Sequence, residues 1–286
     1  MDREGLDALD GLVAEWLRRG LQILAPRFDS GRGLHRRLLQ APEGVGTGRR
    51  DRRGSNSAGK ANMNSDYAVQ RLKMVDGQLR TTDVSSVPLL DAMLTVPREE
   101  FVPGRSKPLA YIDEDIKIAD ARSVRPARYL MEPSPFAKLL QLAEIRPSDF
   151  ILDIGSGTGY SAAVLSLIGS SVIGLESDAD LSAAATETLN RLGFDNVAVV
   201  DGPLAEGYAS EAPFDVIVIE GAVDDVPPAL FDQLKDGGRL VAVIGQGNAA
   251  KATLFMKENG IIAERRAFNS AIKPLVEFSR APSFQF

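Results

Sequence analysis

The segment 151–160, Ile-Leu-Asp-Ile-Gly-Ser-Gly-Thr-Gly-Tyr, constrains the fold of this chain more than any other feature. Its first four residues are mainly apolar, which predicts a short buried strand. The apolar run at 162–168 predicts a helix directly after the glycines. A strand, a glycine-rich turn and a helix in this order form the nucleoside- or phosphate-binding corner of a doubly wound α/β domain. Glycines suit that corner because they adopt positive φ and let the backbone approach a ligand closely.

The spacing of these glycines separates two kinds of nucleotide chemistry. A dinucleotide-binding turn has the pattern G-x-G-x-x-G, and Asp153 would repel a pyrophosphate. An acid followed by G-x-G-x-G is typical instead of S-adenosylmethionine (SAM)-dependent methyltransferases, whose cofactor carries cationic amino and sulfonium groups. The segment also lacks the Gly-Lys-Ser/Thr of a P-loop. We therefore expect SAM to bind at Asp153, Gly155, Ser156, Gly157 and Gly159; the alternative is a tight turn without a ligand.

Two further acids follow apolar runs at positions that suit a nucleoside. Glu176 comes 23 residues after Asp153, close to the offset of ~20 residues at which a ribose-binding acid ends the second strand. Its carboxylate would accept hydrogen bonds from both ribose hydroxyls, unless it is a solvated acid that begins a loop. Asp201 and Gly202 close a third strand at 197–200. Asp201 either accepts a hydrogen bond from the adenine amino group or caps the loop, and the sequence leaves both interpretations open.

The composition excludes several other chemistries. The chain has no cysteine and one histidine, His35. Disulfides and thiolate metal sites are therefore absent, and a Ser-His-Asp triad or a histidine-rich zinc site has almost no raw material. We expect no metal. Methyl transfer to a carboxylate is compatible with this composition, because the carboxylate is already ionised at neutral pH and the sulfonium of the cofactor activates the methyl group. The protein has mainly to align the two and exclude water.

The charge distribution bears on partners. The formal net charge is −6, and the first 62 residues carry an excess of basic side chains, so the remainder is strongly acidic. An acidic body argues against a nucleic-acid substrate, which favours a basic face. No apolar run reaches the length of about 18 residues that a membrane-spanning helix needs. The oligomeric state cannot be inferred from these features.

Residues 1–62 differ in character from the rest of the chain. Apolar residues at three- and four-residue steps from Leu6 to Leu24 predict an amphipathic helix, and the glycine- and arginine-rich stretch 44–60 predicts a disordered basic linker. We expect Met63 to be the start of the functional chain and the residues before it to be upstream sequence. A membrane-surface or partner-binding segment, or a targeting peptide, is the alternative; the acidic first turn argues against the last of these.

The remaining chain predicts an α/β fold in two parts. Helical patterns in 63–148 predict an N-terminal helical cap that includes an acceptor loop. Residues 149–286 alternate strand and helix patterns, which predicts a SAM-binding domain with a Rossmann-like, doubly wound and mostly parallel sheet of about seven strands. We expect its last two strands, near 251–257 and 276–279, to pair antiparallel at the edge.

Five blocks carry a resemblance to a known family. They are Arg71–Leu79, Leu90–Pro103 with its Val-Pro-Arg-Glu-Glu-Phe-Val-Pro stretch, Ala110–Asp113, the glycine motif, and Pro227–Gly245. From Met63 onward the chain resembles the protein-L-isoaspartate O-methyltransferases. The resemblance implies SAM as the cofactor and repair methylation of L-isoaspartyl carboxylates in damaged proteins or peptides. It also implies a cytoplasmic protein.

The chain departs from the family pattern in the loop that binds the acceptor. The family has Gly-x-Gly-Gln-Thr-Ile-Ser-Gln-Pro, whereas residues 118–135 lack the Thr-Ile-Ser element. Alignment on Pro135 places Pro133 at the serine position and Ser134 one position away. The family's Thr-Ala-Ala after strand four is Glu-Gly-Ala here, and we expect the carboxylate of Glu220 to repel an anionic acceptor.

Three arginines in the altered loop offer compensating charge. Arginine binds carboxylates in a bidentate fashion, so we expect Arg125 and Arg128, together with Ser134, to act as the catalytic residues; Arg122 lies on the same loop. The alternative is that these arginines form a solvated loop. The altered loop also leaves two rival functions: a SAM methyltransferase with another acceptor, such as a small molecule, or a SAM-binding homologue without catalysis.

Overall fold

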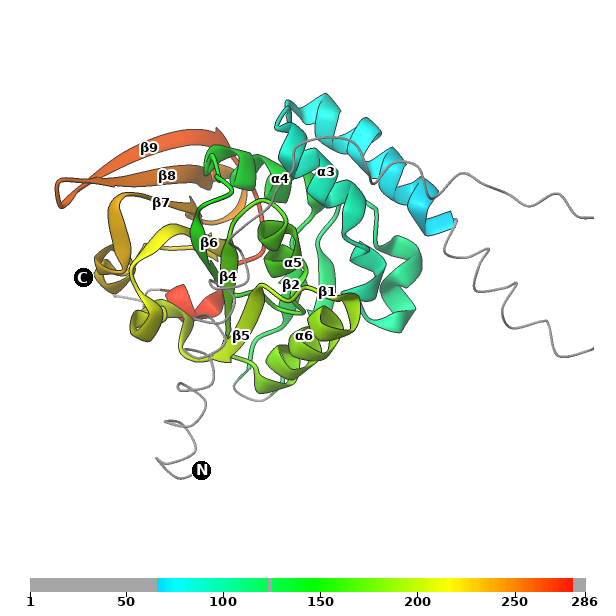
Figure 1. The fold of residues 1–286 in the computed structure, drawn as a ribbon. Coiled ribbons are helices and arrows are strands. Elements are labelled where there is room, and N and C mark those ends of the chain that lie inside the picture. Colours follow the sequence, from blue (N-terminus) through cyan, green and yellow to red (C-terminus); the bar gives the residue numbers. More distant parts are fainter. Residues whose placement is uncertain (1–65, 123–124, 280–286) are drawn as a thin grey trace, which may run out of the picture. The chain divides into compact units, whose positions relative to one another are not determined.

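A seven-stranded sheet forms the centre of the part of the chain that the computed structural model describes, residues 66–122 and 125–279 (Figure 1). The described residues belong to one unit, Asn64–Phe286, and the helix and linker predicted for 1–62 lie outside them. The strands, in their order across the sheet, are β5 (Val197–Asp201), β4 (Ser171–Glu176), β3 (Phe150–Ile154), β6 (Phe214–Val223), β7 (Leu234–Ile244), β8 (Lys251–Glu258) and β9 (Ile261–Asn269).

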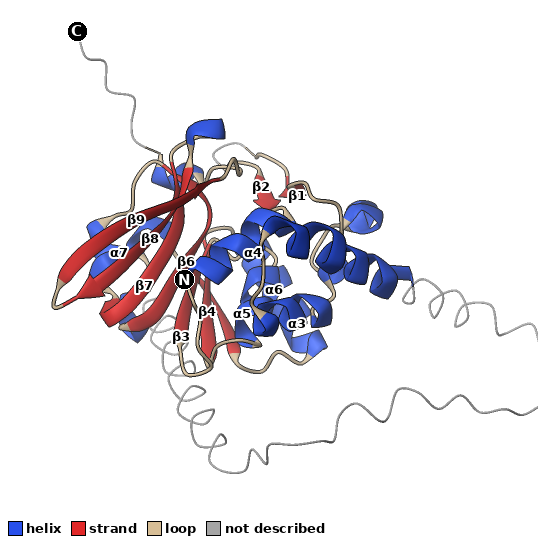
Figure 2. Cartoon of the chain, turned by 90° about the horizontal axis from the view of Figure 1, so that it is seen from above, coloured by secondary structure: helices blue, strands red, loops and turns tan. Residues whose placement is uncertain are grey.

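The first five strands of that order run parallel, β8 runs antiparallel to β7, and β9 runs antiparallel to β8. The parallel strands β3, β4 and β6 are apolar along almost their whole length because helices or loops cover both faces of the sheet. Figure 2 shows α4 (Pro133–Leu142), α5 (Tyr160–Ser166) and α6 (Ala179–Leu192) on one side and α7 (Pro228–Asp232) on the other. This arrangement confirms the predicted mostly parallel α/β fold.

The edge of the sheet differs from the sequence-based expectation. The final strand is β9, and the residues expected to form it instead contain a short 3₁₀ helix, η9 (Val276–Phe278). The turn between β8 and β9 is Asn259-Gly260, with φ of 51° and 75°. Two successive residues with positive φ make the tight hairpin turn whose twist matches that of the strands. The prediction for 251–257 was therefore correct, and that for 276–279 was wrong.

The predicted cap is helical. Residues 66–74 form a helix that continues into a π-helical turn, η2 (Val75–Leu79). After it come η3 (Arg80–Thr82), α3 (Val87–Thr95), η4 (Arg98–Glu100) and η5 (Gly104–Leu109). Arg71 donates to the hydroxyl of Tyr111 (2.8 Å) and to the carboxylate of Glu99 (3.2 Å). One hydrogen-bonded cluster thus joins the three N-terminal blocks on which the family resemblance depends.

Arg98 and Tyr160 attach the cap to the sheet domain. The fully buried Arg98 donates from Nε to the carbonyl of Ala110 (2.8 Å) and from Nη2 to that of Met131 (2.6 Å). Its guanidinium lies 4.7 Å from the ring centroid of Tyr160, the first residue of α5. The aromatic residue that follows the glycine motif is therefore part of the core that holds cap and sheet together.

A two-stranded hairpin leads from the cap to α4. Its strands are β1 (Ile116–Ala119) and β2 (Arg128–Leu130), which pair antiparallel. Towards its tip, the backbones of Arg122 and Arg125 exchange hydrogen bonds of 2.8 and 2.6 Å. The hairpin thereby holds the arginines of the altered loop in fixed relation to one another.

Candidate active site

The glycine turn follows β3 at the carboxyl edge of the parallel strands, where α/β sheets bind their ligands. Gly155, Gly157 and Gly159 have φ of 81°, 56° and 91°, values that side chains other than glycine rarely adopt. A Cβ at position 159 would also lie 3.0 Å from Leu189 Cδ1. The turn therefore needs these glycines for its backbone conformation and for the packing of the following helices.

Asp153, at the end of β3, is completely buried. Its Oδ2 accepts a hydrogen bond of 2.6 Å from Ser161 Oγ, while its Oδ1 has no hydrogen-bond partner among the described residues. Burial, aided by the negative charge of Glu176 and opposed by the bond from Ser161, raises the pKa of Asp153 to about 7. The hydroxyl of Ser156 nearby is likewise buried and unpartnered within the described chain.

Glu176 joins the end of β4 to the glycine turn. The backbone N–H groups of Ser177 (2.8 Å) and Asp178 (3.0 Å) donate to its Oε1, and that of Gly157 (2.8 Å) donates to its Oε2. Asp201 is its neighbour across the β4–β5 pair. The fold thus brings together, at one edge of the sheet, the groups predicted to bind the cofactor.

Gly202 and Asp201 extend this edge along β5. The N–H of Gly202 donates to the backbone carbonyl of Glu176 at 3.0 Å. The side chain of Asp201 is exposed, so it is available to a ligand in a way that the fully buried Asp153 is not.

Arg128 occupies the acceptor atoms of Glu176 in this structure. From β2, its Nη1 lies 2.5 Å from Oε1 and its Nη2 2.9 Å from Oε2, and Nη2 also lies 3.3 Å from the carbonyl oxygen of Gly155. Both side chains are buried. The guanidinium therefore binds the same carboxylate that the sequence assigns to the ribose. The expected acceptor-binding arginine is paired, in this arrangement, with a carboxylate of the protein itself.

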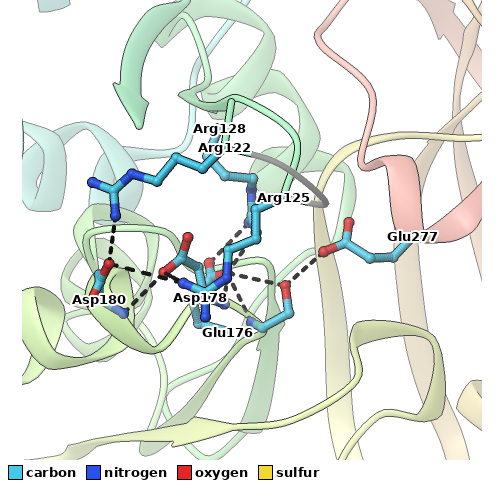
Figure 3. Close-up of polar contacts among 8 residues, drawn as sticks. Arg122, Arg125, Arg128, Glu176, Asp178, Asp180 and Glu277 are labelled. Carbon is cyan, nitrogen blue, oxygen red and sulfur yellow. Dashed lines mark hydrogen bonds and ion pairs between the residues drawn. The ribbon is translucent and has the colours of Figure 1, made fainter. Parts of the chain in front are cut away.

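The other two arginines repeat this pairing towards the tip of the hairpin. Arg125 lies 2.9 Å from Asp178, and Arg122 lies 2.9 Å from Asp180. We call the three pairs Arg122–Asp180, Arg125–Asp178 and Arg128–Glu176 the arginine ladder (Figure 3). The two outer pairs are exposed to solvent, so each contributes at most about 1 kcal/mol. The exposed Arg122 and Arg125 are compatible with the alternative of a solvated loop, whereas Arg128 is buried against Glu176.

Apolar side chains complete the cover over the glycine turn. Ile118 of β1 lies so close that a Cβ on Gly157 would be 2.7 Å from its Cδ1, and Leu275 lies 3.1 Å from the Cβ position of Gly155. Ser177 Oγ donates to Glu277 of η9 at 2.6 Å. The hairpin and the segment 275–278 therefore both lie on the turn.

These observations test whether the site fits SAM. The residue types fit: the glycine turn offers backbone groups, and Glu176 at the end of β4 and the exposed Asp201 at the end of β5 offer carboxylate acceptors, to a cationic, hydroxyl-bearing ligand. Their arrangement adds one condition. Because Arg128 holds both oxygens of Glu176, a ribose can use that carboxylate only where the guanidinium has moved away.

Ser134 lies in a different environment from the predicted acceptor clamp. Its Oγ donates to Asp113 Oδ2 at 2.6 Å and its backbone N–H donates to Oδ1 at 2.9 Å. Pro133 is the first residue of α4, where the missing N–H of proline costs nothing. Together, these contacts fix the start of α4.

A small cavity of about 10 Å³, room for about one water molecule, lies at the end of β6. It is lined by Asp115, Tyr129, Met131, Glu220, Gly221, Ile272 and Lys273. Sequence reasoning had singled out only Glu220 of this set. In the described ranges 66–122 and 125–279, no cluster of three or more His, Cys, Asp or Glu side chains could hold a metal ion, and no helix is long and apolar enough to cross a membrane.

The partners of the arginines were missed from the sequence, although a signal was present. Arginines stand at every third position from 122 to 128, and acids at every second position from 176 to 180. Nothing local connects the two series, which are about fifty residues apart in the chain. Ser161, which donates to Asp153 from only eight residues further along the chain, was also missed.

Comparison with known proteins shows which family the chain is similar to. The family described as "Protein-L-isoaspartate(D-aspartate) O-methyltransferase (PCMT)" matches residues 70–279. A protein-L-isoaspartate O-methyltransferase of Koribacter versatilis is 38% identical over 210 residues, which cover 73% of this chain and 92% of the relative. Protein-L-isoaspartate O-methyltransferase 2 of Shewanella sediminis is 40% identical over 179 residues, covering 63% and 71% of the two chains.

Solved structures share the fold. A protein-L-isoaspartate O-methyltransferase superposes with a TM-score of 0.62 at 28% identity, covering 71% of this chain and 65% of that chain. The structure of a Plasmodium falciparum protein, titled as a putative protein-L-isoaspartate O-methyltransferase in complex with S-adenosyl-L-homocysteine, has a TM-score of 0.60 at 22% identity and covers 71% and 96%. At that identity the second likeness supports the fold alone.

Proposed function

Since the chain belongs to the protein-L-isoaspartate O-methyltransferase family, a family of SAM-dependent enzymes, we propose that it methylates L-isoaspartyl carboxylates at the carboxyl edge of its parallel strands. The observation that carries the proposal is the position of the glycine turn, Asp153 and Glu176 at one edge of the sheet, within the matched residues 70–279. Its substrates are damaged proteins or peptides that carry L-isoaspartate, and we place the reaction in the cytoplasm.

The side chains divide the work as follows. SAM supplies an activated methyl group when it is bound. The glycine turn, Ser156, Glu176, Asp201 and Gly202 would hold the cofactor, with the carboxylate of Glu176 accepting hydrogen bonds from its ribose hydroxyls and Asp201 with Gly202 serving its adenine. Leu275, which covers the turn from outside the hairpin, would exclude water there. Exclusion of water matters because it strengthens the electrostatic interactions inside the site and prevents side reactions; the protein also has to hold the two reactants in line.

In this proposal the hairpin has two positions, one with the arginine ladder formed and one with Arg128 separated from Glu176. With the ladder formed, Arg128 holds Glu176 and the hairpin covers the turn. When a ribose takes Glu176, Arg128 is released together with the hairpin that bears Arg125. Two guanidinium groups then become available for the carboxylate of the acceptor, a ligand that arginine binds with two parallel hydrogen bonds. Ser134 contributes by fixing the start of α4 through Asp113.

Methyl transfer to a synthetic peptide tests the proposed function. An isoaspartyl peptide and the same peptide with a normal aspartyl residue are each incubated with the protein and SAM, and S-adenosylhomocysteine release is measured. We expect turnover with the isoaspartyl peptide only. Equal turnover with both peptides, or none with either, would contradict the proposal.

Two rival functions remain testable in the same assay. The missing Thr-Ile-Ser element and the occupied Glu176 carboxylate favour either another acceptor or a SAM-binding role without turnover. Release of S-adenosylhomocysteine with a metabolite mixture but not with the isoaspartyl peptide would indicate another acceptor. Calorimetric binding of SAM without turnover on any acceptor would indicate a binding protein.

A further inference from the structure

The turn between β8 and β9 has a chemically reactive sequence that the proposed function does not use. Asn259 is the only asparagine of the chain that is followed by a glycine. Both residues of the turn are exposed, and a Cβ built on Gly260 would have no atom within 4 Å. The turn lies at the tip of the hairpin that forms the edge of the sheet (Figure 1). Its backbone therefore has free space in which to rearrange.

An asparagine followed by glycine converts to isoaspartate without an enzyme. The backbone nitrogen of the glycine attacks the side-chain carbonyl carbon of the asparagine, loses its proton to solvent and expels the side-chain amide as ammonia, which leaves a cyclic succinimide. Glycine favours this step because it has no Cβ to obstruct the approach. Water then opens the ring; when it attacks the backbone carbonyl, the chain continues through the former side chain and the α-carboxylate becomes free.

One hydrogen bond controls this conversion in the folded protein. The N–H of Gly260 donates to Asp236 Oδ1 at 3.3 Å, and the bond retains the proton that the attacking nitrogen must lose. The distance is long for a hydrogen bond and Asp236 is exposed, so the turn opens locally at a low cost in free energy. We therefore expect slow conversion of Asn259, with Asp236 as the residue that retards it.

The turn cannot reach the candidate active site of its own chain. β8 starts opposite the end of β7, where Lys251 pairs with Ile244, and runs back along that strand. The eight residues of β8 thus place the turn roughly 25 Å from the carboxyl edge of the parallel strands. Because β8 is paired on both sides, the hairpin cannot fold over onto that edge. A second copy of the chain can approach the exposed turn from solvent.

We propose that Asn259–Gly260 is a modification site, at which spontaneous deamidation forms an isoaspartyl residue whose free α-carboxylate is methylated by a second copy of this chain. One oxygen of that carboxylate takes the methyl group from the sulfonium of SAM, and S-adenosylhomocysteine is released. The assignment of the site depends on the turn alone, whereas its methylation rests on the proposed function. The protein is then both enzyme and substrate, and the reaction joins two molecules.

Ageing of the full chain at mildly alkaline pH, below its melting temperature, tests the assignment of the site. Peptide mapping by mass spectrometry measures the conversion of each asparagine. We expect Asn259 to convert faster than Asn248, an exposed asparagine followed by alanine. Asp236→Ala removes the acceptor of the Gly260 N–H and should speed the conversion of Asn259 at least about threefold. Asp232→Ala removes another exposed acid and should leave the rate unchanged.

Incubation of the aged protein with SAM that carries a labelled methyl group tests the second step. The aged parent should take up label at position 259. Aged Asn259→Gly should lose that label, because glycine suits the positive φ of the turn but cannot deamidate, and aged Asn248→Gly should keep it. The label taken up per molecule should rise with protein concentration. A rate per molecule that does not depend on concentration would overturn the intermolecular reaction.

A synthetic isoaspartyl peptide distinguishes failure of this inference from failure of the proposed function. Turnover on the peptide without label at position 259 of the aged parent would overturn self-methylation and leave the proposed function intact. Label introduced at position 259 by an independently active isoaspartyl methyltransferase, with no turnover by the parent on either acceptor, would support the assigned site and contradict the proposed function. Conversion of Asn259 no faster than that of Asn248 would overturn the assignment of the site. Melting temperatures verify that the variants are folded.

Discussion

Replacement of Arg128 by alanine should weaken the fold and strengthen SAM binding at the same time. Removal of one partner from a buried ion pair costs about 3–5 kcal/mol when the other charge is left unpaired. Glu176 keeps three backbone N–H donors, so we expect a loss of about 2–3 kcal/mol in the free energy of unfolding of the cofactor-free protein. In a domain of this size, each kcal/mol of lost stability lowers the melting temperature by about 2–4 °C, so we expect the melting temperature to fall by about 4–12 °C.

The same substitution removes the group that competes with the ribose for Glu176. When a ligand must first break a contact within the protein, the free energy of that contact reduces the apparent free energy of binding. The Kd of Arg128→Ala for SAM should therefore fall at least about tenfold, since each 1.4 kcal/mol is a factor of ten. Arg122→Ala and Arg125→Ala remove exposed pairs and should change the Kd less than about fivefold.

Isothermal titration calorimetry and thermal melting provide the assay. Arg105→Ala, which breaks the exposed Arg105–Asp120 pair outside the ladder, controls for the loss of one positive charge. An Arg128→Ala variant with SAM affinity equal to or weaker than that of the parent would refute the reasoning. Weaker binding would mean that the guanidinium contacts the bound cofactor rather than competing with it.

Three further predictions concern the acids of the site and the extent of the domain. Glu176→Ala should weaken SAM binding by about 1.5–3 kcal/mol through loss of charge-assisted hydrogen bonds, and an unchanged calorimetric affinity would contradict this role. Because the pKa of Asp153 is raised to about 7 in the folded protein, its contribution to stability is full below the ordinary pKa of an aspartate and is lost as the pH rises to about 7. Between about pH 5 and pH 8 the melting temperature of Asp153→Asn should therefore fall less than that of the parent. Equal falls in the two proteins would contradict this prediction. A chain that starts at Met63 should keep the melting temperature and SAM affinity of the full chain; a marked drop in either would show that residues 1–62 stabilise the domain.

The cofactor corner was predictable because its determinants are local. Three glycines with positive φ, an acid before them and an acid at the end of the next strand follow from spacing along the chain. The final strand was also predictable in principle: the Asn259-Gly260 pair is a strong hairpin signal, and it indicates a strand directly after β8. Residues 276–278 form a 3₁₀ helix instead of extending the sheet, and Leu275 just before it lies against Gly155 of the glycine turn.

The arginine ladder depends on tertiary structure. Each ladder pair joins residues about fifty positions apart, and arginine in a polar loop is equally compatible with solvent, a substrate or an ion pair. Ser134 likewise suits either an acceptor clamp or a helix start until its bond to Asp113 is seen.

A crystal structure of the protein with S-adenosylhomocysteine tests the central claim most directly. The account predicts that the carboxylate of Glu176 lies within hydrogen-bond distance of both ribose hydroxyls and that the guanidinium of Arg128 has left it. A bound S-adenosylhomocysteine with the Arg128–Glu176 pair still at its present distances of 2.5 and 2.9 Å would contradict both the assigned role of Glu176 and the displacement of the hairpin.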